Sequence, residues 1–143
     1  MSHTDLWTYP QFTQDCSVSN AAARAKAEAE NREVLAAIRQ DWRKAKRSYS
    51  ALLDEFNAFT VRRPIGWWTD PDKYRGAMGE EAYRHIARIN AALDVAKAEM
   101  TLAEVRDLAI TFPLGEDRRA DQVRESEAAL EASKHRFNCL QRQ

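Results

Sequence analysis

The feature that most constrains this chain is a regular seam of apolar residues between positions 35 and 59. Its spacing alternates between three and four residues, which places every member on one face of an α-helix. The seam is therefore typical of a long helix packed against partners, and we predict that this helix spans about residues 20–60. Its members are Leu35, Ile38, Trp42, Ala45, Tyr49, Leu52, Phe56 and Phe59.

The composition supports an all-α fold. The 143 residues include only four glycines and four prolines, whereas Ala, Glu, Arg and Leu are frequent, as in long helices. No stretch alternates β-branched residues between turn signals, so strands are not predicted. Two further apolar seams predict helices over about 80–111 and 117–140. We therefore predict one domain over residues 20–143, an antiparallel three-helix bundle built from a long helical hairpin and a third helix.

The third predicted helix is short of apolar residues. Val123, Leu130 and Phe137 lie near one face, but Glu127 and Lys134 occupy the remaining positions of the predicted seam. We therefore expect this helix to be half exposed or to be completed by another molecule. Self-association of the chain through a surplus apolar face is an alternative that the sequence leaves open.

The first 19 residues lack helical periodicity and are predicted to form an extended arm. Pro10 prevents a helix in this segment, which carries the aromatic residues Trp7, Tyr9 and Phe12. We expect these aromatic side chains to lie across the bundle. The alternative is that the arm docks into a groove of a partner protein.

The connection predicted over residues 61–79 is longer than the roughly two to eight residues usual between bundle helices. It contains two adjacent tryptophans, which cannot both face the same way on a regular element. One interpretation has both indoles closing the end of the bundle, and the other leaves one exposed. An exposed tryptophan beside arginines has the composition of a binding hot spot. The candidate partner-binding residues are Trp67, Trp68, Arg62, Arg63 and Arg75.

Charge is balanced over the whole chain, with 22 basic and 22 acidic residues. This balance argues against a generic nucleic-acid-binding protein, which has a strong basic excess. A local excess remains, because residues 20–63 contain ten basic and six acidic residues. Its densest part is a candidate surface for phosphate or for an acidic protein, although long basic side chains also flank apolar seams for solubility. The candidate basic face consists of Arg39, Arg43, Lys44, Lys46 and Arg47.

Signatures of catalysis and of metal binding are lacking in the sequence. It contains no glycine-rich phosphate loop, no Cys-x-x-Cys pair and no His-Glu-x-x-His helix. Glu81 with His85, and Glu131 with His135, place a carboxylate and an imidazole four residues apart, but the helix register sets the two pairs too far apart to share a metal. We therefore predict no enzyme, no metal and no cofactor, and we expect Cys139 to be a reduced thiol in the core.

These features lead to two functional hypotheses. The first is a non-enzymatic protein-binding module, such as an adaptor, an inhibitor or an assembly subunit of the kind that viruses also encode. The alternative is a nucleic-acid-associated accessory protein that uses the basic face. No apolar run approaches the ~18 residues of a membrane span, and no secretory leader is visible. The expected partner is therefore another protein rather than a membrane, and the expected location is the cytoplasm.

Overall fold

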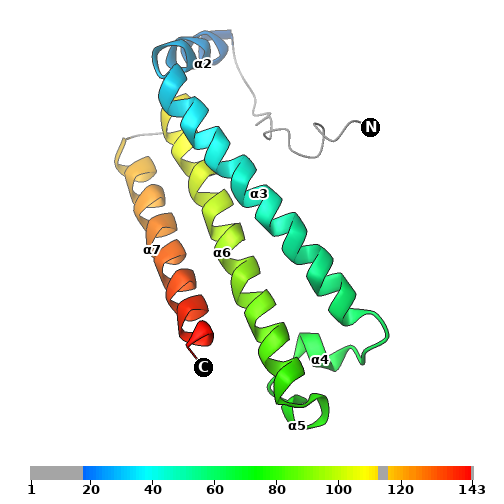
Figure 1. Cartoon of the computed structure of the whole chain (residues 1–143). Helices are drawn as coiled ribbons and strands as arrows, with labels where there is room; N and C mark the ends of the chain where they lie inside the picture. The colour runs from blue at the N-terminus through cyan, green and yellow to red at the C-terminus, as the bar shows by residue number, and fades with distance from the viewer. Residues whose placement is uncertain (1–17, 113–115, 143) are drawn as a thin grey trace.

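The computed structural model describes residues 18–112 and 116–142, which form six helices and no strand (Figure 1). The all-helical prediction is confirmed. The predicted arm, with Trp7, Tyr9 and Phe12, lies outside the described residues, apart from its last two residues, which belong to the first described helix. In chain order the helices are α2 (Val18–Glu30), α3 (Arg32–Thr60), α4 (Gly66–Thr69), α5 (Arg75–Met78), α6 (Glu80–Thr111) and α7 (Glu116–Gln141).

The central element is α6, which packs against α3 along one side and against α7 along the other (Figure 1). Small side chains allow both neighbours to approach this helix, and Ala91, Ala96 and Ala103 are all buried. The substantial helix contacts do not include one between α3 and α7. The three long helices therefore form an open layer around α6, with neighbouring helices running in opposite directions.

The predicted seam forms the contact between α3 and α6. Leu35, Trp42, Ala45 and Phe59 are buried, and the members of the seam between Ala45 and Phe59 are half-buried. The indole Nε1 of Trp42 donates a hydrogen bond to Glu104 Oε1 at 3.0 Å. That bond pairs the one polar atom of a large buried side chain, which would otherwise carry a desolvation cost.

The helix predicted over residues 20–60 is divided in two at Asn31. This residue has φ −116° and ψ 27°, and its side-chain amide donates to the Ala27 carbonyl oxygen at 2.9 Å. Beyond the break, α2 turns across the C-terminal end of α6 (Figure 1), where the Arg24 guanidinium lies 4.5 Å from the centre of the Phe112 ring. The sequence of α2 contains no large apolar residue after Val18, so no apolar stripe indicates which way it packs.

The register of α7 on α6 differs from the predicted one. Leu130 and Ser133 are buried and Ser126 is half-buried, whereas Glu127 and Lys134 are exposed. The prediction that the two charged residues occupy the seam is therefore wrong. Ser126 and Ser133 occupy the seam instead, because a small side chain lets α7 approach the alanine-rich surface of α6 closely.

Candidate interaction site

The adjacent tryptophans belong to a cluster that closes the end of the α3–α6 pair. Both lie on α4, both are half-buried, and both pack against a core of Phe59, Met78 and Ile86. Gly66 allows the close packing at this point, because an added Cβ atom would lie 2.3 Å from the Tyr74 ring. The structure thus favours the interpretation in which the indoles support the fold rather than project into solvent.

The exposed apolar residues at this end are Val61 and Ile65. These residues are 60% and 70% exposed, and in the described part of the chain Val34 is the only other large hydrophobic residue that is exposed. Arg62 between them has φ 64°, a left-handed conformation that is unfavourable for a residue with a Cβ atom. We call Val61, Arg62, Arg63 and Ile65 the end patch.

The arginines predicted at this end have different surroundings. The Arg63 guanidinium lies 4.3 Å from the centre of the Phe59 ring and hydrogen-bonds the Phe59 carbonyl oxygen. Arg75 forms a bidentate pair with Glu80 at 2.7 and 2.8 Å and lies over the ring of Tyr83. This pairing lowers the pKa of the Glu80 carboxyl. Arg75 is thus already paired within the chain, whereas the structure gives Arg62 no ion-pair partner among the described residues.

The candidate basic face is divided by the fold. Arg39 points inward, where its Nε donates to Asp107 Oδ2 at 2.8 Å and its Nη2 lies 3.2 Å from Glu28 Oε1. Asp107 is fully buried, and its second oxygen accepts a hydrogen bond from Thr111. Burial acts to lower the pKa of Arg39, but the hydrogen bonds and charges of Asp107 and Glu28 together raise it. Arg39 therefore belongs to a structural ion-pair network.

The remaining cations of this segment point in different directions. Arg43 lines a hollow between α2 and α3, and Lys44 lines a groove on the opposite side, between α3 and α7. Lys46 lies 5.4 Å from the centre of the Tyr49 ring. Arg47 is exposed. The five residues do not form one continuous basic surface, which removes most of the support for phosphate binding along this helix.

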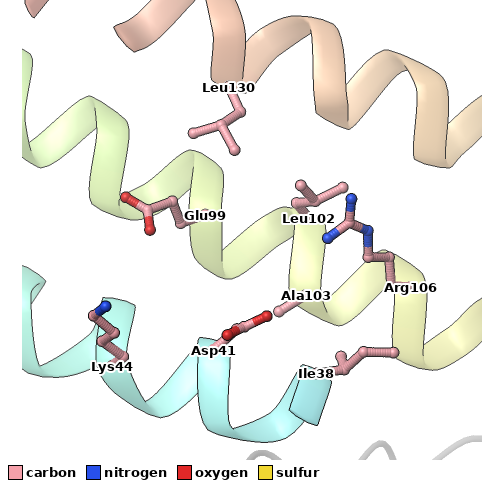
Figure 2. Close-up of a pocket in the computed structure, with 8 residues that line it drawn as sticks. All are labelled: Ile38, Asp41, Lys44, Glu99, Leu102, Ala103, Arg106 and Leu130. Carbon is pink, nitrogen blue, oxygen red and sulfur yellow. The ribbon is translucent and has the colours of Figure 1, made fainter. Parts of the chain in front are cut away.

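The groove between α3 and α7 is a cavity of about 250 Å³ (Figure 2). Its floor is apolar, but the side chains of Leu102 and Leu130 are already buried by the chain itself. Two acidic and two basic side chains form its rim, so the groove has no preference for a ligand of either charge. The lining residues are Ile38, Asp41, Lys44, Glu99, Leu102, Ala103, Arg106 and Leu130.

The histidines of the two Glu–His pairs noted in the sequence lie in different surroundings. The His85 ring packs on Phe59, with 5.7 Å between ring centres. His135 lies instead beside Cys139, with 3.6 Å between Nε2 and Sγ. Cys139 is exposed, so its predicted place in the core is wrong. Within residues 18–112 and 116–142, no three His, Cys, Asp or Glu side chains are grouped as metal ligands.

Comparison of the chain with protein-family models, with curated proteins and with solved structures gives no match. Among the helices of the described residues, none has a stretch that is both apolar enough and long enough to cross a bilayer. Function is therefore inferred from the surfaces of the protein, and chiefly from the end patch.

Two features of these surfaces were not predicted from the sequence. The sequence prediction for this end named two tryptophans and three arginines, but the large apolar residues that are exposed there are Val61 and Ile65. The buried network was also missed. A signal for it is present, because Asp107 continues the apolar seam of α6 four residues after Ala103, and a charged residue there needs a partner.

Proposed function

We propose that the protein is a non-enzymatic protein-binding module that contacts its partner through the end patch. The observation that carries this proposal is the exposure of Val61 and Ile65 on either side of Arg62, whose backbone is held in a left-handed conformation. Unfavourable backbone conformations persist only where surrounding structure enforces them, and they are frequent at binding sites. Here the patch is connected to the indole cluster by Arg63, whose guanidinium lies over the ring of Phe59 in that cluster.

The chemistry of the end patch suits an apolar surface of a partner that also carries hydrogen-bond acceptors. Burying a large aliphatic side chain stabilises a complex by roughly 1.5–3 kcal/mol when the side chain starts fully exposed. Val61 and Ile65 are about two-thirds exposed, so we expect about 1–2 kcal/mol from each. Together they account for roughly a 100-fold change in affinity.

The nucleic-acid alternative has less support. It requires a row of cations that can follow a phosphate backbone, but Arg39 is held by Asp107 and Glu28, and Lys44 faces a different groove from Arg43. What remains of the predicted basic face is too scattered to favour that function over protein binding.

A paired comparison of variants tests the proposal. Val61→Ser/Ile65→Ser removes the apolar side chains of the end patch, and Val34→Ser makes the same kind of change at another exposed position, where the side chain is 54% exposed. Because all three residues are exposed, both variants should keep the helical circular dichroism and thermal stability of the wild type.

The readout is quantitative mass spectrometry of proteins that co-purify with the chain from its native cells. We expect a partner that binds the wild type and Val34→Ser but is lost with the end-patch variant. If the end-patch variant retains every partner, or if the wild type retains none, the proposed site is wrong. The indoles are less suitable targets, because truncating them would disturb the end cluster.

A further inference from the structure

We infer that the hollow between α2 and α3 binds an acidic helix of a partner protein, at a second surface separate from the end patch. The hollow has a volume of about 650 Å³ and forms where α2 turns away from α3 at Asn31. It is open to solvent, and three alanines, Ala25, Ala29 and Ala36, contribute to its walls. Because alanine side chains are short, the hollow has room for the backbone of another helix to approach.

Three arginines give the α2–α3 hollow its charge. Arg32, Arg39 and Arg43 are seven and four residues apart, so they lie along one face of α3. A single carboxylate, that of Glu28, lies among them and is bonded to Arg39 and Arg24. Neither Arg32 nor Arg43 has an ion-pair partner in the part of the chain that the structure describes. Within the part of the chain that the structure describes, the hollow therefore keeps a positive charge at Arg32 and Arg43.

Carboxylates are the anions that best fit this charge. Among the described residues, Arg39 donates hydrogen bonds to two carboxylates, those of Glu28 and Asp107. A guanidinium presents parallel N–H donors that match the two oxygens of a carboxylate. Carboxylates on a partner would pair with Arg32 and Arg43 in the same way that Glu28 and Asp107 pair with Arg39.

The spacing of the unpaired arginines indicates a helical partner. Arg32 and Arg43 are eleven residues apart on α3, which is about 16 Å along the helix axis. A second helix lying beside α3 presents residues eleven apart on one face with the same separation. A glutamate at each of those positions would meet the two guanidinium groups at once.

A nucleic acid fits this surface less well. Its backbone carries a phosphate every few ångströms, so affinity depends on many cations in a continuous row. The α2–α3 hollow offers two unpaired cations, and Glu33 and Asp41 are exposed on the same helix. Electrostatic repulsion by these carboxylates opposes a long polyanion more than it opposes a helix with two matched glutamates.

The test uses two synthetic alanine-based helical peptides and the full chain. One peptide carries two glutamates eleven residues apart, on one face. The other carries the same two glutamates nine residues apart, which places them on opposite faces at the same net charge. Binding is followed at low ionic strength by the nuclear magnetic resonance signals of the protein, including the arginine Nε–H groups.

We expect the first peptide to bind more tightly and to shift the signals of Arg32 and Arg43. Arg32→Gln/Arg43→Gln should weaken its binding about tenfold, as the loss of two partly exposed ion pairs predicts. The matched control, Arg47→Gln/Arg84→Gln, removes two exposed arginines elsewhere and should leave binding unchanged. Circular dichroism is expected to show that both variants stay folded.

Four binding results would overturn the inference. They are no binding of either peptide, equal binding of the two peptides, an equal loss in the control variant, and tighter binding of a single-stranded oligonucleotide of the same charge. Self-association that disappears in Arg32→Gln/Arg43→Gln would also overturn it, because the occupant would then be a second copy of the chain. None of these outcomes depends on the end patch, so the two proposals can fail independently.

Discussion

The substitution Asp107→Asn tests whether the buried ion pair between α6 and α3 holds the fold together. Asp107 is 0% exposed, and its carboxylate accepts hydrogen bonds from Arg39 Nε at 2.8 Å and Thr111 Oγ1 at 3.0 Å. Breaking a buried pair by removing one charge costs about 3–5 kcal/mol. Arg39 is 26% exposed and keeps its contact with Glu28, so we expect a value below that range, about 2–3 kcal/mol.

This loss is measurable by urea denaturation followed with circular dichroism. In a domain of this size it corresponds to a decrease in Tm of roughly 10 °C. Asp121→Asn is the matched control, because Asp121 pairs with Arg124 on the exposed surface of α7. Surface pairs contribute about 0.2–1 kcal/mol, so the control should change stability little. A cost of less than about 1 kcal/mol for Asp107→Asn would show that the buried ion pair does not hold α3 and α6 together.

A double-mutant cycle separates the ion pair from its surroundings. Asp107→Leu and Arg39→Met each leave a charge without its main partner, whereas the double variant replaces the pair with apolar side chains. Such replacements are often close to neutral in stability, so the double variant should cost at least about 2 kcal/mol less than the sum of the single variants. The Thr111 hydroxyl can still donate to the Asp107 carbonyl oxygen at 2.9 Å. Additive effects would show that the two side chains are not coupled.

Two further predictions concern α7 and the end cluster. Ser133→Leu should destabilise the protein by about 1–3 kcal/mol in urea denaturation, because Ser133 is buried at a close helix contact. The control Lys134→Leu should change stability by less than about 0.5 kcal/mol. The opposite order would support the register predicted from sequence. Tyr83 donates to Asp72 Oδ1 at 2.6 Å, and this hydrogen bond is the main cause that raises its pKa above the ordinary 10.0. The stability it contributes is therefore fully present below pH 10 and is lost as the pH rises through the higher pKa of the folded state. The difference between the ultraviolet tyrosinate titrations of the wild type and Tyr83→Phe isolates this group, and an ordinary or lower pKa would contradict the prediction.

The sequence predicted α3 and α6 well because their packing is driven by large periodic side chains. Leu35, Trp42 and Phe59 are buried as predicted, and both ends of α6 agree with the predicted helix over about 80–111. A bulky apolar residue every three or four positions has one stable environment, the interior, whichever partner covers it. Periodicity alone is therefore enough to locate α6 and the packed part of α3, although it did not predict that α3 begins at Arg32.

The position of α2 and the register of α7 could not be predicted in the same way. The sequence of α2 favours a helix but gives no apolar face, so its direction depends on polar contacts from elsewhere, such as Arg24 with Phe112 and Glu28 with Arg39. In α7 the seam includes Ser126 and Ser133, which a search for apolar residues does not select. Both cases depend on the surface that the helix meets, which local sequence does not specify.

The roles of the charged residues in the candidate sites could not be predicted from local sequence either. Five cations on one stretch of helix look alike in sequence, yet the fold buries the guanidinium of Arg39 against Asp107 and leaves Arg43 facing the α2–α3 hollow. The difference comes from α6, which places a buried carboxylate opposite one of them. Whether a basic residue supports the fold or remains available for a partner therefore depends on the neighbouring helix.

The ion-pair network also bears on the proposed binding of an acidic helix. Arg39 lies between Arg32 and Arg43 in the α2–α3 hollow, and it contacts a carboxylate of α6 and a carboxylate of α2. The bond to Glu28 ties α2 to α3, and the bond to Asp107 ties both to the centre of the layer. The walls of the hollow are thus held in place before any partner arrives, which lowers the entropy cost of binding. Loss of Asp107 should therefore weaken peptide binding as well as stability, although Asp107 is buried and the peptide does not touch it.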